Sequence, residues 1–175
     1  KGAGSECITI EGVKSLKGCE YTVIPDRIEV GTFLIAAAIT RSTINLSPCE
    51  PKHLKAVITK LEHCGCKFEY SKHILRIIPK QILNSVNMTT SPFPGFPTDL
   101  QAPFMALMAT ANGTSRIEEK VFENRMHHVK ELNRMGANIS LRNNVATVIG
   151  VKNLKGCPVL GSDLRATAAL ALAGL

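Results

Sequence analysis

The chain has 175 residues, 45% of them hydrophobic, which suits one domain of ordinary size with an apolar core. No apolar run reaches the roughly 18 residues that cross a bilayer, and no signal-peptide pattern opens the chain, so we expect no membrane partner. The net charge of +7 favours an anionic ligand, but the basic residues are scattered and Trp is absent, so we expect no nucleic-acid partner.

We expect residues 1–14 to form a linker and a first strand, and residues 15–175 to form one domain. The opening Lys1–Ser5 is typical of a linker. The chain ends within an apolar helical pattern, without the polar turn and the Gly or Asn cap that usually end a helix. We therefore expect the natural protein to continue beyond this point.

Three Asp residues each stand before a run of small apolar residues that is typical of a buried helix. Asp often caps a helix by accepting hydrogen bonds from its first amides, so the three positions indicate helix starts. The first and third follow the same tetrapeptide, Leu-Lys-Gly-Cys at 16–19 and 154–157, and a strand-like stretch. The pairs are Asp26 with 28–39, Asp99 with 100–111, and Asp163 with 164–175.

A second helix and a pair of strands follow the first two of these helices. Apolar residues three and four apart predict amphipathic helices that end at Gly65 and Gly136. Alternating residues on both sides of a polar turn then predict a hairpin in each copy. The expected strands are 68–70, 74–78, 139–141 and 145–149.

Together these elements make a repeated β-α-β-α-β-β unit of about seventy residues, which is longer than a solenoid repeat. We expect two complete units at about 15–80 and 84–150, and a truncated third at 153–175. Alignment of the first two units matches Ile44 with Ile117. The first helix of each unit has almost no charge, so we expect it to be buried on all sides, with the sheets around these helices. The pattern predicts an α/β fold with internal pseudo-symmetry.

The segment 91–104 is rich in Pro and Gly and delivers Asp99 to the start of an apolar helix. Pro103 suits the first turn of that helix, whose positive end would then carry one carboxylate. Two interpretations follow. Asp99 is only an N-cap, which the spacing alone favours, or its carboxylate meets a ligand.

Six cysteines occur in the chain. Cys64-Gly65-Cys66 has one intervening residue, which is the wrong spacing for a zinc knuckle or a redox motif, and no second cluster accompanies the neighbouring His63. We expect free thiols in a reducing compartment, with no metal and no cofactor.

Five segments carry a resemblance to a known family: Pro25–Phe33, Phe96–Ala102, Val121–Arg125 with His128, Leu132–Ala137 and Asp163–Ala166. They resemble UDP-N-acetylglucosamine 1-carboxyvinyltransferases, a branch of the enolpyruvyl transferase family, and the match covers essentially the whole chain in order. The resemblance implies an inside-out α/β barrel of β-α-β-α-β-β units, the second of the family's two domains. This fold agrees with the repeat.

The resemblance also implies a reaction. A longer protein would transfer the enolpyruvyl group of phosphoenolpyruvate to the 3′-hydroxyl of UDP-N-acetylglucosamine, the first committed step of peptidoglycan precursor synthesis. This chain would supply one half of an active site between two domains. Asp99 matches the family's aspartate at the sugar hydroxyl, where a carboxylate has to accept the proton, so the resemblance favours the functional interpretation over the plain cap.

Further site residues follow from the resemblance. Val121 matches a backbone contact to the nucleotide sugar. Arg125 and Arg165 match arginines that face the small anionic substrate, whose carboxylate or phosphate suits a guanidinium fork. Asp163 is expected to orient Arg165. Glu123 is the expected neighbour of Arg125, and a plain surface salt bridge between the two is an alternative of equal weight.

Other parts of the family's site have no match in these residues. The resemblance implies that a cysteine-bearing loop, a Lys-Asn pair and further arginines belong to the other domain, so that domain is the expected partner and the isolated chain should be inactive. His127 and His128 are expected to lie in the packed interior or on the surface and to take no part in catalysis. A bacterial source implies the cytoplasm, and a plant source the plastid stroma.

Two other functions stay open. The sister enzyme, 3-phosphoshikimate 1-carboxyvinyltransferase, shares the fold and the co-substrate, although the segments 96–99 and 122–125 favour the aminosugar enzyme. Binding of each substrate to the two-domain protein separates these two. The other alternative is a non-catalytic homologue that binds nucleotide sugars, which a gene without the first domain and its cysteine loop would indicate.

Overall fold

The computed structural model describes residues 1–175, and every regular element lies between residues 27 and 173. The order helix, strand, helix, strand, strand occurs twice, with a short strand between the two series and a last helix after them. The helices are α1 (Arg27–Thr40), α2 (Lys55–Cys64), α3 (Gln101–Met108), α4 (His128–Arg134) and α5 (Leu164–Ala173), with 3₁₀ helices η1 (Pro51–Leu54) and η2 (Thr98–Leu100). The strands are β1 (Ile44–Leu46), β2 (Lys67–Ser71), β3 (Ile74–Ile78), β4 (Met88–Thr89), β5 (Thr114–Glu118), β6 (Asn138–Arg142) and β7 (Val145–Ile149).

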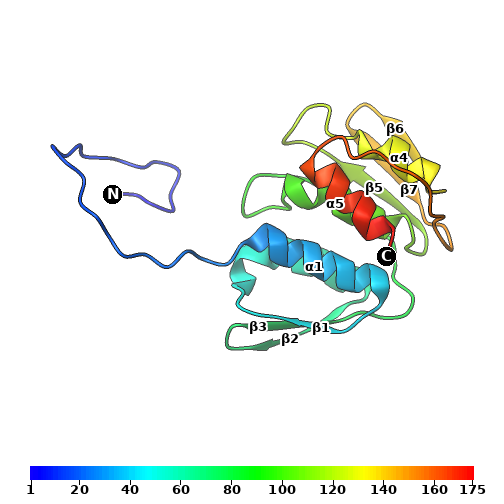
Figure 1. Cartoon of the computed structure of the whole chain (residues 1–175), viewed down its shortest axis with the longest axis horizontal. Coiled ribbons are helices and arrows are strands. Elements are labelled where there is room, and N and C mark those ends of the chain that lie inside the picture. The colour runs from blue at the N-terminus through cyan, green and yellow to red at the C-terminus, as the bar shows by residue number, and fades with distance from the viewer.

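The strands form two sheets around a group of central helices. In the first sheet β3 lies between β1 and β2 and is antiparallel to both. The second sheet has the order β4-β5-β7-β6, with only β4 and β5 parallel. Helix α1 packs against the first sheet, α3 packs against the second, and α5 contacts both helices (Figure 1). The expectation of central helices with sheets around them is confirmed.

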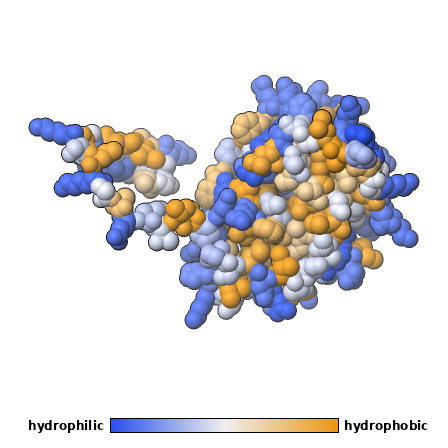
Figure 2. Space-filling view, viewed as in Figure 1, coloured by the Kyte–Doolittle hydropathy of each residue, from blue (hydrophilic) through white to orange (hydrophobic).

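Only α3 is buried along its whole length. It lies between α1, α5 and the second sheet, so no side of it reaches solvent. Helices α1 and α5 each keep an exposed side, where Phe33 is 50% and Leu164 is 74% exposed, and Figure 2 shows apolar residues on this face. The prediction that the first helix of every unit is buried on all sides is therefore wrong for α1 and α5.

Residues 1–26 form no helix or strand and extend away from the helices (Figure 1). The expected first strand within 1–14, and the strand-like stretches before Asp26 and Asp163, are therefore wrong. A strand needs a ladder partner, and residues 20–24 are exposed without a backbone hydrogen bond to β1. In the second copy the matching strand is the short β4, which has its partner in β5.

The other expected helices and both hairpins are confirmed, with their ends shifted by a few residues. Gly65 ends α2 at a φ of 109°, a left-handed conformation that glycine adopts without the steric cost of a Cβ. Asn143 in the β6–β7 turn has a φ of 56°, as its place in a hairpin turn favours.

The ladders correct the alignment of the two copies. Leu46 lies opposite Leu75, and Ile117 lies opposite Ala146, at the same place in the two hairpins. Ile117 therefore matches Leu46 rather than Ile44. A slip of two residues keeps the same side chains on the same face of a strand, so an alternating pattern alone does not reveal it.

Candidate active site

The Pro-rich segment before Asp99 is tied to α3. The backbone amide of Ser91 donates to the carbonyl of Phe96 at 3.0 Å, which closes the loop on itself. The Phe96 ring is buried and lies edge-on to Phe104 of α3, with ring centroids 5.3 Å apart. This packing sets the place at which the chain enters η2 and presents Asp99.

Asp99 is not an N-cap. It lies inside η2, whose N-cap position is Pro97, and no helix amide donates to its carboxylate. By contrast, Asp26 accepts from the Ile28 amide at 2.7 Å, and Asp163 accepts from two amides at the start of α5, both at 2.9 Å. The plain-cap interpretation of Asp99 is wrong, and its carboxylate is left for other partners.

Two arginines from distant parts of the chain converge on Asp99. Nη2 of Arg125 and Nε of Arg165 lie 3.0 Å and 3.2 Å from the same oxygen, Oδ1. The other oxygen, Oδ2, accepts no hydrogen bond from the protein. The three side chains are between 22% and 34% exposed, so the cluster is open to solvent on one side. Two guanidinium groups around one carboxylate leave a net positive charge that suits an anionic ligand.

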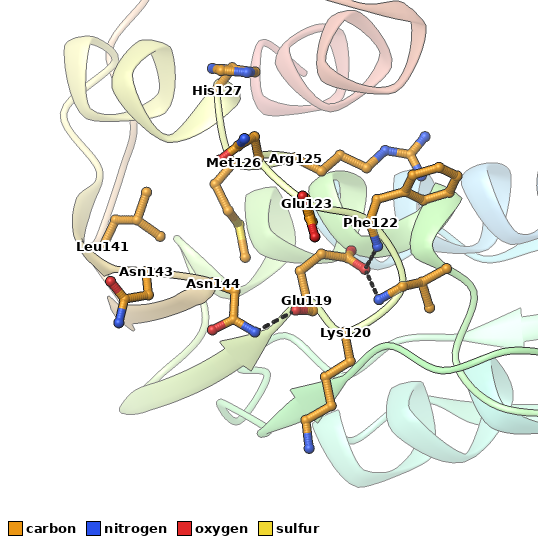
Figure 3. Close-up of a pocket in the computed structure, with 12 residues that line it drawn as sticks. Glu119, Lys120, Phe122, Glu123, Arg125, Met126, His127, Leu141, Asn143 and Asn144 are labelled. Carbon is orange, nitrogen blue, oxygen red and sulfur yellow. Dashed lines mark hydrogen bonds between the residues drawn. The ribbon is translucent and has the colours of Figure 1, made fainter.

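Three groups hold the Arg125 side chain. Its Nη1 donates to Oγ1 of Thr98 at 2.9 Å, its Nη2 binds Asp99, and its guanidinium carbon lies 4.8 Å from the centre of the Phe122 ring. Figure 3 shows the guanidinium and this ring next to each other. Glu123 makes no hydrogen bond or ion pair, so the structure does not bring it to Arg125 and the alternative salt bridge is not formed.

Asp163 contacts the backbone at the start of α5 and not the guanidinium group of Arg165. The amides of Ala166 and Arg165 hold the pKa of the Asp163 carboxyl below its usual range, with the Ala166 bond as the larger cause. The carboxylate thus determines where α5 begins, and from that point Arg165 reaches Asp99. The structure connects Asp163 to Arg165 only through this helix start.

Val121 lies at an open cavity of about 820 Å³, which Arg125 of this cluster also lines. Its backbone amide donates to Oε1 of Glu119 at 2.8 Å, while its side chain is partly exposed. The volume falls in the range of ordinary ligand sites. The cavity lining includes Lys120, Phe122, Arg125, Leu141 and Asn143.

Thr98 and Glu119 belong to this site and were not singled out from the sequence. Oγ1 of Thr98 joins the Arg125 guanidinium to the Glu119 carboxylate. Glu119 is only 2% exposed, but it stands between Glu118 and Lys120 in a stretch typical of a solvated strand end. No spacing pattern marks which of these charged residues is buried.

No group of three or more His, Cys, Asp or Glu side chains is placed to hold a metal ion. All six cysteines are unpaired, and burial raises the pKa of the Cys64 thiol to about 12 and that of Cys66 to about 11. Both therefore stay protonated and unreactive at neutral pH. None of the helices combines the length and the apolar character that a membrane crossing requires.

The fold is that of the enolpyruvyl transferases. The enolpyruvyl transferase NikO from Streptomyces tendae superimposes with a TM-score of 0.73 at 25% identity, covering 87% of this chain and 37% of that one. EPSP synthase from Acinetobacter baumannii has the same fold, with a TM-score of 0.67 at 18% identity over 89% of this chain and 38% of that one. Residues 1–175 also match the EPSP synthase (3-phosphoshikimate 1-carboxyvinyltransferase) family, and the chain belongs to this family.

Similar curated proteins carry a more specific name. UDP-N-acetylglucosamine 1-carboxyvinyltransferase 2 from Prochlorococcus marinus is 63% identical over all of this chain. UDP-N-acetylglucosamine 1-carboxyvinyltransferases from Synechococcus sp. and Nostoc sp. are 59% and 55% identical over 99% and 100% of the chain. The chain spans only 41%, 40% and 39% of the length of these three relatives.

Proposed function

We propose that this chain supplies one half of the active site of a longer protein, which transfers enolpyruvyl from phosphoenolpyruvate to the 3′-hydroxyl of UDP-N-acetylglucosamine. The observation that carries this proposal is the cluster of Asp99, Arg125 and Arg165, of which Arg125 also lines the open cavity. A carboxylate with one oxygen free of protein partners stands beside two cations. The names of the similar curated proteins support the same reaction.

In this proposal the free Oδ2 of Asp99 accepts the proton of the sugar 3′-hydroxyl, while the oxygen of that hydroxyl bonds to C2 of phosphoenolpyruvate. Arg125 and Arg165 neutralise the carboxylate and phosphate of that co-substrate. An acid from the other domain protonates the methylene carbon. Loss of a proton from the resulting methyl group then expels inorganic phosphate and restores the double bond in the product.

The proposal extends to the rest of the molecule. The two helix-and-hairpin series and α5 correspond to one unit without its opening strand, one complete unit and the start of a third in an inside-out α/β barrel, and the other domain of the same protein is the partner. The unpaired cysteines support a reducing compartment, and we place the longer protein in the cytoplasm or, in a plant, in the plastid stroma.

The test replaces Asp99 in the longer protein. Asp99→Asn keeps the shape of the side chain but accepts no proton, so kcat should fall by roughly 10²- to 10⁴-fold. Asp26→Asn is the matched control, because Asp26 stands at the equivalent helix start in the first copy and Asn caps helices equally well. Phosphate release with UDP-N-acetylglucosamine gives the readout, and wild-type kcat in Asp99→Asn would contradict the proposal.

The same assay separates the sister reaction. Shikimate 3-phosphate in place of the nucleotide sugar should give no phosphate release, because we assign the cavity beside Val121 to the nucleotide sugar. Turnover with shikimate 3-phosphate alone would assign the longer protein to the sister enzyme, and binding of the nucleotide sugar without any turnover would indicate a non-catalytic homologue.

A further inference from the structure

Glu119 is a buried carboxylate without a cation beside it. It is 2% exposed, and the neighbouring Arg116 and Lys120 form ion pairs with Glu118 instead. An unpaired carboxylate is costly to bury, and an apolar residue of similar volume would fill the same space at lower cost. Packing alone therefore does not account for a Glu at this position.

Four hydrogen bonds satisfy the Glu119 carboxylate. Oε1 accepts from the Thr90 hydroxyl at 2.7 Å and from the backbone amides of Val121 and Phe122 at 2.8 Å and 3.1 Å. Oε2 accepts from the Thr98 hydroxyl at 2.8 Å. Figure 3 shows the two amide bonds that tie the loop back to this side chain. Glu119 thus joins the loop that contains Val121 and Phe122 to the segment that carries Asp99.

The Thr98 bond continues into the arginine cluster. Thr98 donates its hydroxyl proton to Glu119 and accepts from Nη1 of Arg125 at 2.9 Å. The same guanidinium donates to Asp99, which also accepts a hydrogen bond from Nε of Arg165. An unbroken series of hydrogen bonds therefore runs from the buried Glu119 to every charged group of the proposed site.

The first copy of the repeat has no buried carboxylate at the same place, and the neighbouring Glu50 is only half-buried and accepts from the Lys52 amide at 3.4 Å. The Cys49 amide donates to the carbonyl of His73 in the turn between β2 and β3, and the Glu119 amide donates to the carbonyl of Asn144 in the matching turn between β6 and β7. Cys49 is also 2% exposed and acts there as a small apolar residue. The fold at this place does not need a buried Glu, and only the copy with the arginine cluster has one.

We propose that Glu119 is a positioning residue of the site. Its Oε2 orients the Thr98 hydroxyl so that a lone pair faces Arg125, and its Oε1 holds the loop at Val121. The proposal rests on the proposed function and deepens it, because it assigns the orientation of the anion-binding Arg125 to a residue that does not touch substrate.

Glu119→Gln in the longer protein separates the role of Oε2, which binds Thr98, from the role of Oε1, which binds the loop at Val121. The amide oxygen can keep the three donors at Oε1, while the amide nitrogen at Oε2 donates to Thr98, whose hydroxyl then has no acceptor. Loss of this charged hydrogen bond should raise KM for phosphoenolpyruvate and lower kcat, each by about tenfold. KM for UDP-N-acetylglucosamine should stay unchanged, and the kinetic defect should persist at temperatures well below the melting temperature of the variant. Glu118→Gln, one residue away and paired with Arg116 and Lys120 instead of Thr98, is the matched control without effect.

Substitutions at Thr98 test the same hydrogen bond, between the Thr98 hydroxyl and Oε2 of Glu119, from the donor side. Thr98→Val removes the hydroxyl and should reproduce the Glu119→Gln pattern, and Thr98→Ser keeps the hydroxyl and should restore wild-type values. In the Thr98→Val background, Glu119→Gln should cause no further change in kcat or in KM for phosphoenolpyruvate, because the shared link is already broken.

Several outcomes would overturn the positioning role. The first is a Glu119→Gln variant with wild-type kcat and KM for phosphoenolpyruvate. The second is a double variant in which the losses of kcat from the two single substitutions multiply. The third is a Glu119→Gln loss of kcat that a lower melting temperature explains in full. If Glu119→Gln does not fold, wild-type constants in Thr98→Val overturn it. A wild-type protein that transfers no enolpyruvyl contradicts the proposed function instead, and titration of the same variants with phosphoenolpyruvate then measures the positioning of Arg125 by binding alone.

Discussion

Asp26, Asp99 and Asp163 each stand at the start of a helical segment but make different contacts. Asp26 and Asp163 have extended backbones and cap α1 and α5. Asp99 is already inside η2, so its side chain points away from the helix amides and toward arginines 26 and 66 residues further along the chain. The local sequence predicts the helix start in all three, and only the distant partners decide the role of Asp99.

His128 shows how burial changes a single residue. It is 2% exposed, and its Nε2 has no hydrogen-bond partner. Burial lowers the pKa of His128 to about 4. The nearby Asp163 opposes this shift, and His127 and Arg125 add to it. The imidazole is therefore neutral in the folded protein at neutral pH, which agrees with the packing role expected from the sequence.

This shift predicts a pH dependence of stability. Between a pH of about 6.5 and 4 the unfolded chain binds a proton at His128 that the folded chain does not. The free energy of unfolding should therefore decrease as the pH is lowered through this range, by roughly 3 kcal/mol in total. His128→Leu should remove this part of the slope, and His127→Leu, at an exposed position, should keep it. Urea unfolding of the longer protein from pH 4 to 7 measures both. Equal slopes in the two variants would contradict the prediction.

At the scale of elements, the end of β7 passes very close to the chain that leaves α3. The Gly150 amide donates to the Gly113 carbonyl at 2.9 Å, and the Val151 amide donates to the Ala109 carbonyl at 2.8 Å. A Cβ at Gly150 would lie 1.6 Å from the Ala111 carbonyl oxygen. This contact between backbones holds the second hairpin against the central helices.

Gly150→Ala should therefore destabilise the protein by about 3 kcal/mol or more, because a backbone neighbour cannot move aside as a side chain can. Gly156→Ala lies in the same connection before α5 with nothing within 4 Å of the added Cβ, and it should leave the melting temperature almost unchanged. Thermal unfolding of the longer protein compares the two. A Gly150→Ala protein as stable as Gly156→Ala would show that the two backbones are not packed in this way.

At the scale of the whole molecule, the groups that the proposed reaction uses gather at one place on the surface. Asp99, Arg125 and Arg165 are each partly exposed, and burial raises the pKa of the Cys64 and Cys66 thiols. The similar curated proteins are more than twice as long as this chain. In the proposed reaction, the proton donor and the remaining anion-binding groups come from outside these 175 residues.

The 175 residues alone should therefore show no enolpyruvyl transfer, although the Asp99 cluster is intact. Phosphate release from phosphoenolpyruvate and UDP-N-acetylglucosamine measures this, with the longer protein as the positive control and circular dichroism as the check that the chain is folded. Turnover by the isolated chain would show that this half holds the complete catalytic machinery.

The sequence by itself determined the helices, the two hairpins, the repeat and the resemblance to a family, because periodicity, caps, turn residues and motif spacing are local properties of a chain. It also named Asp99, Arg125 and Arg165. Only the tertiary structure decided that Asp99 is an arginine partner instead of a cap, that Leu46 matches Ile117, and that the Glu beside Glu118 is buried under the site. These facts depend on contacts between residues far apart in the chain, which no local pattern records.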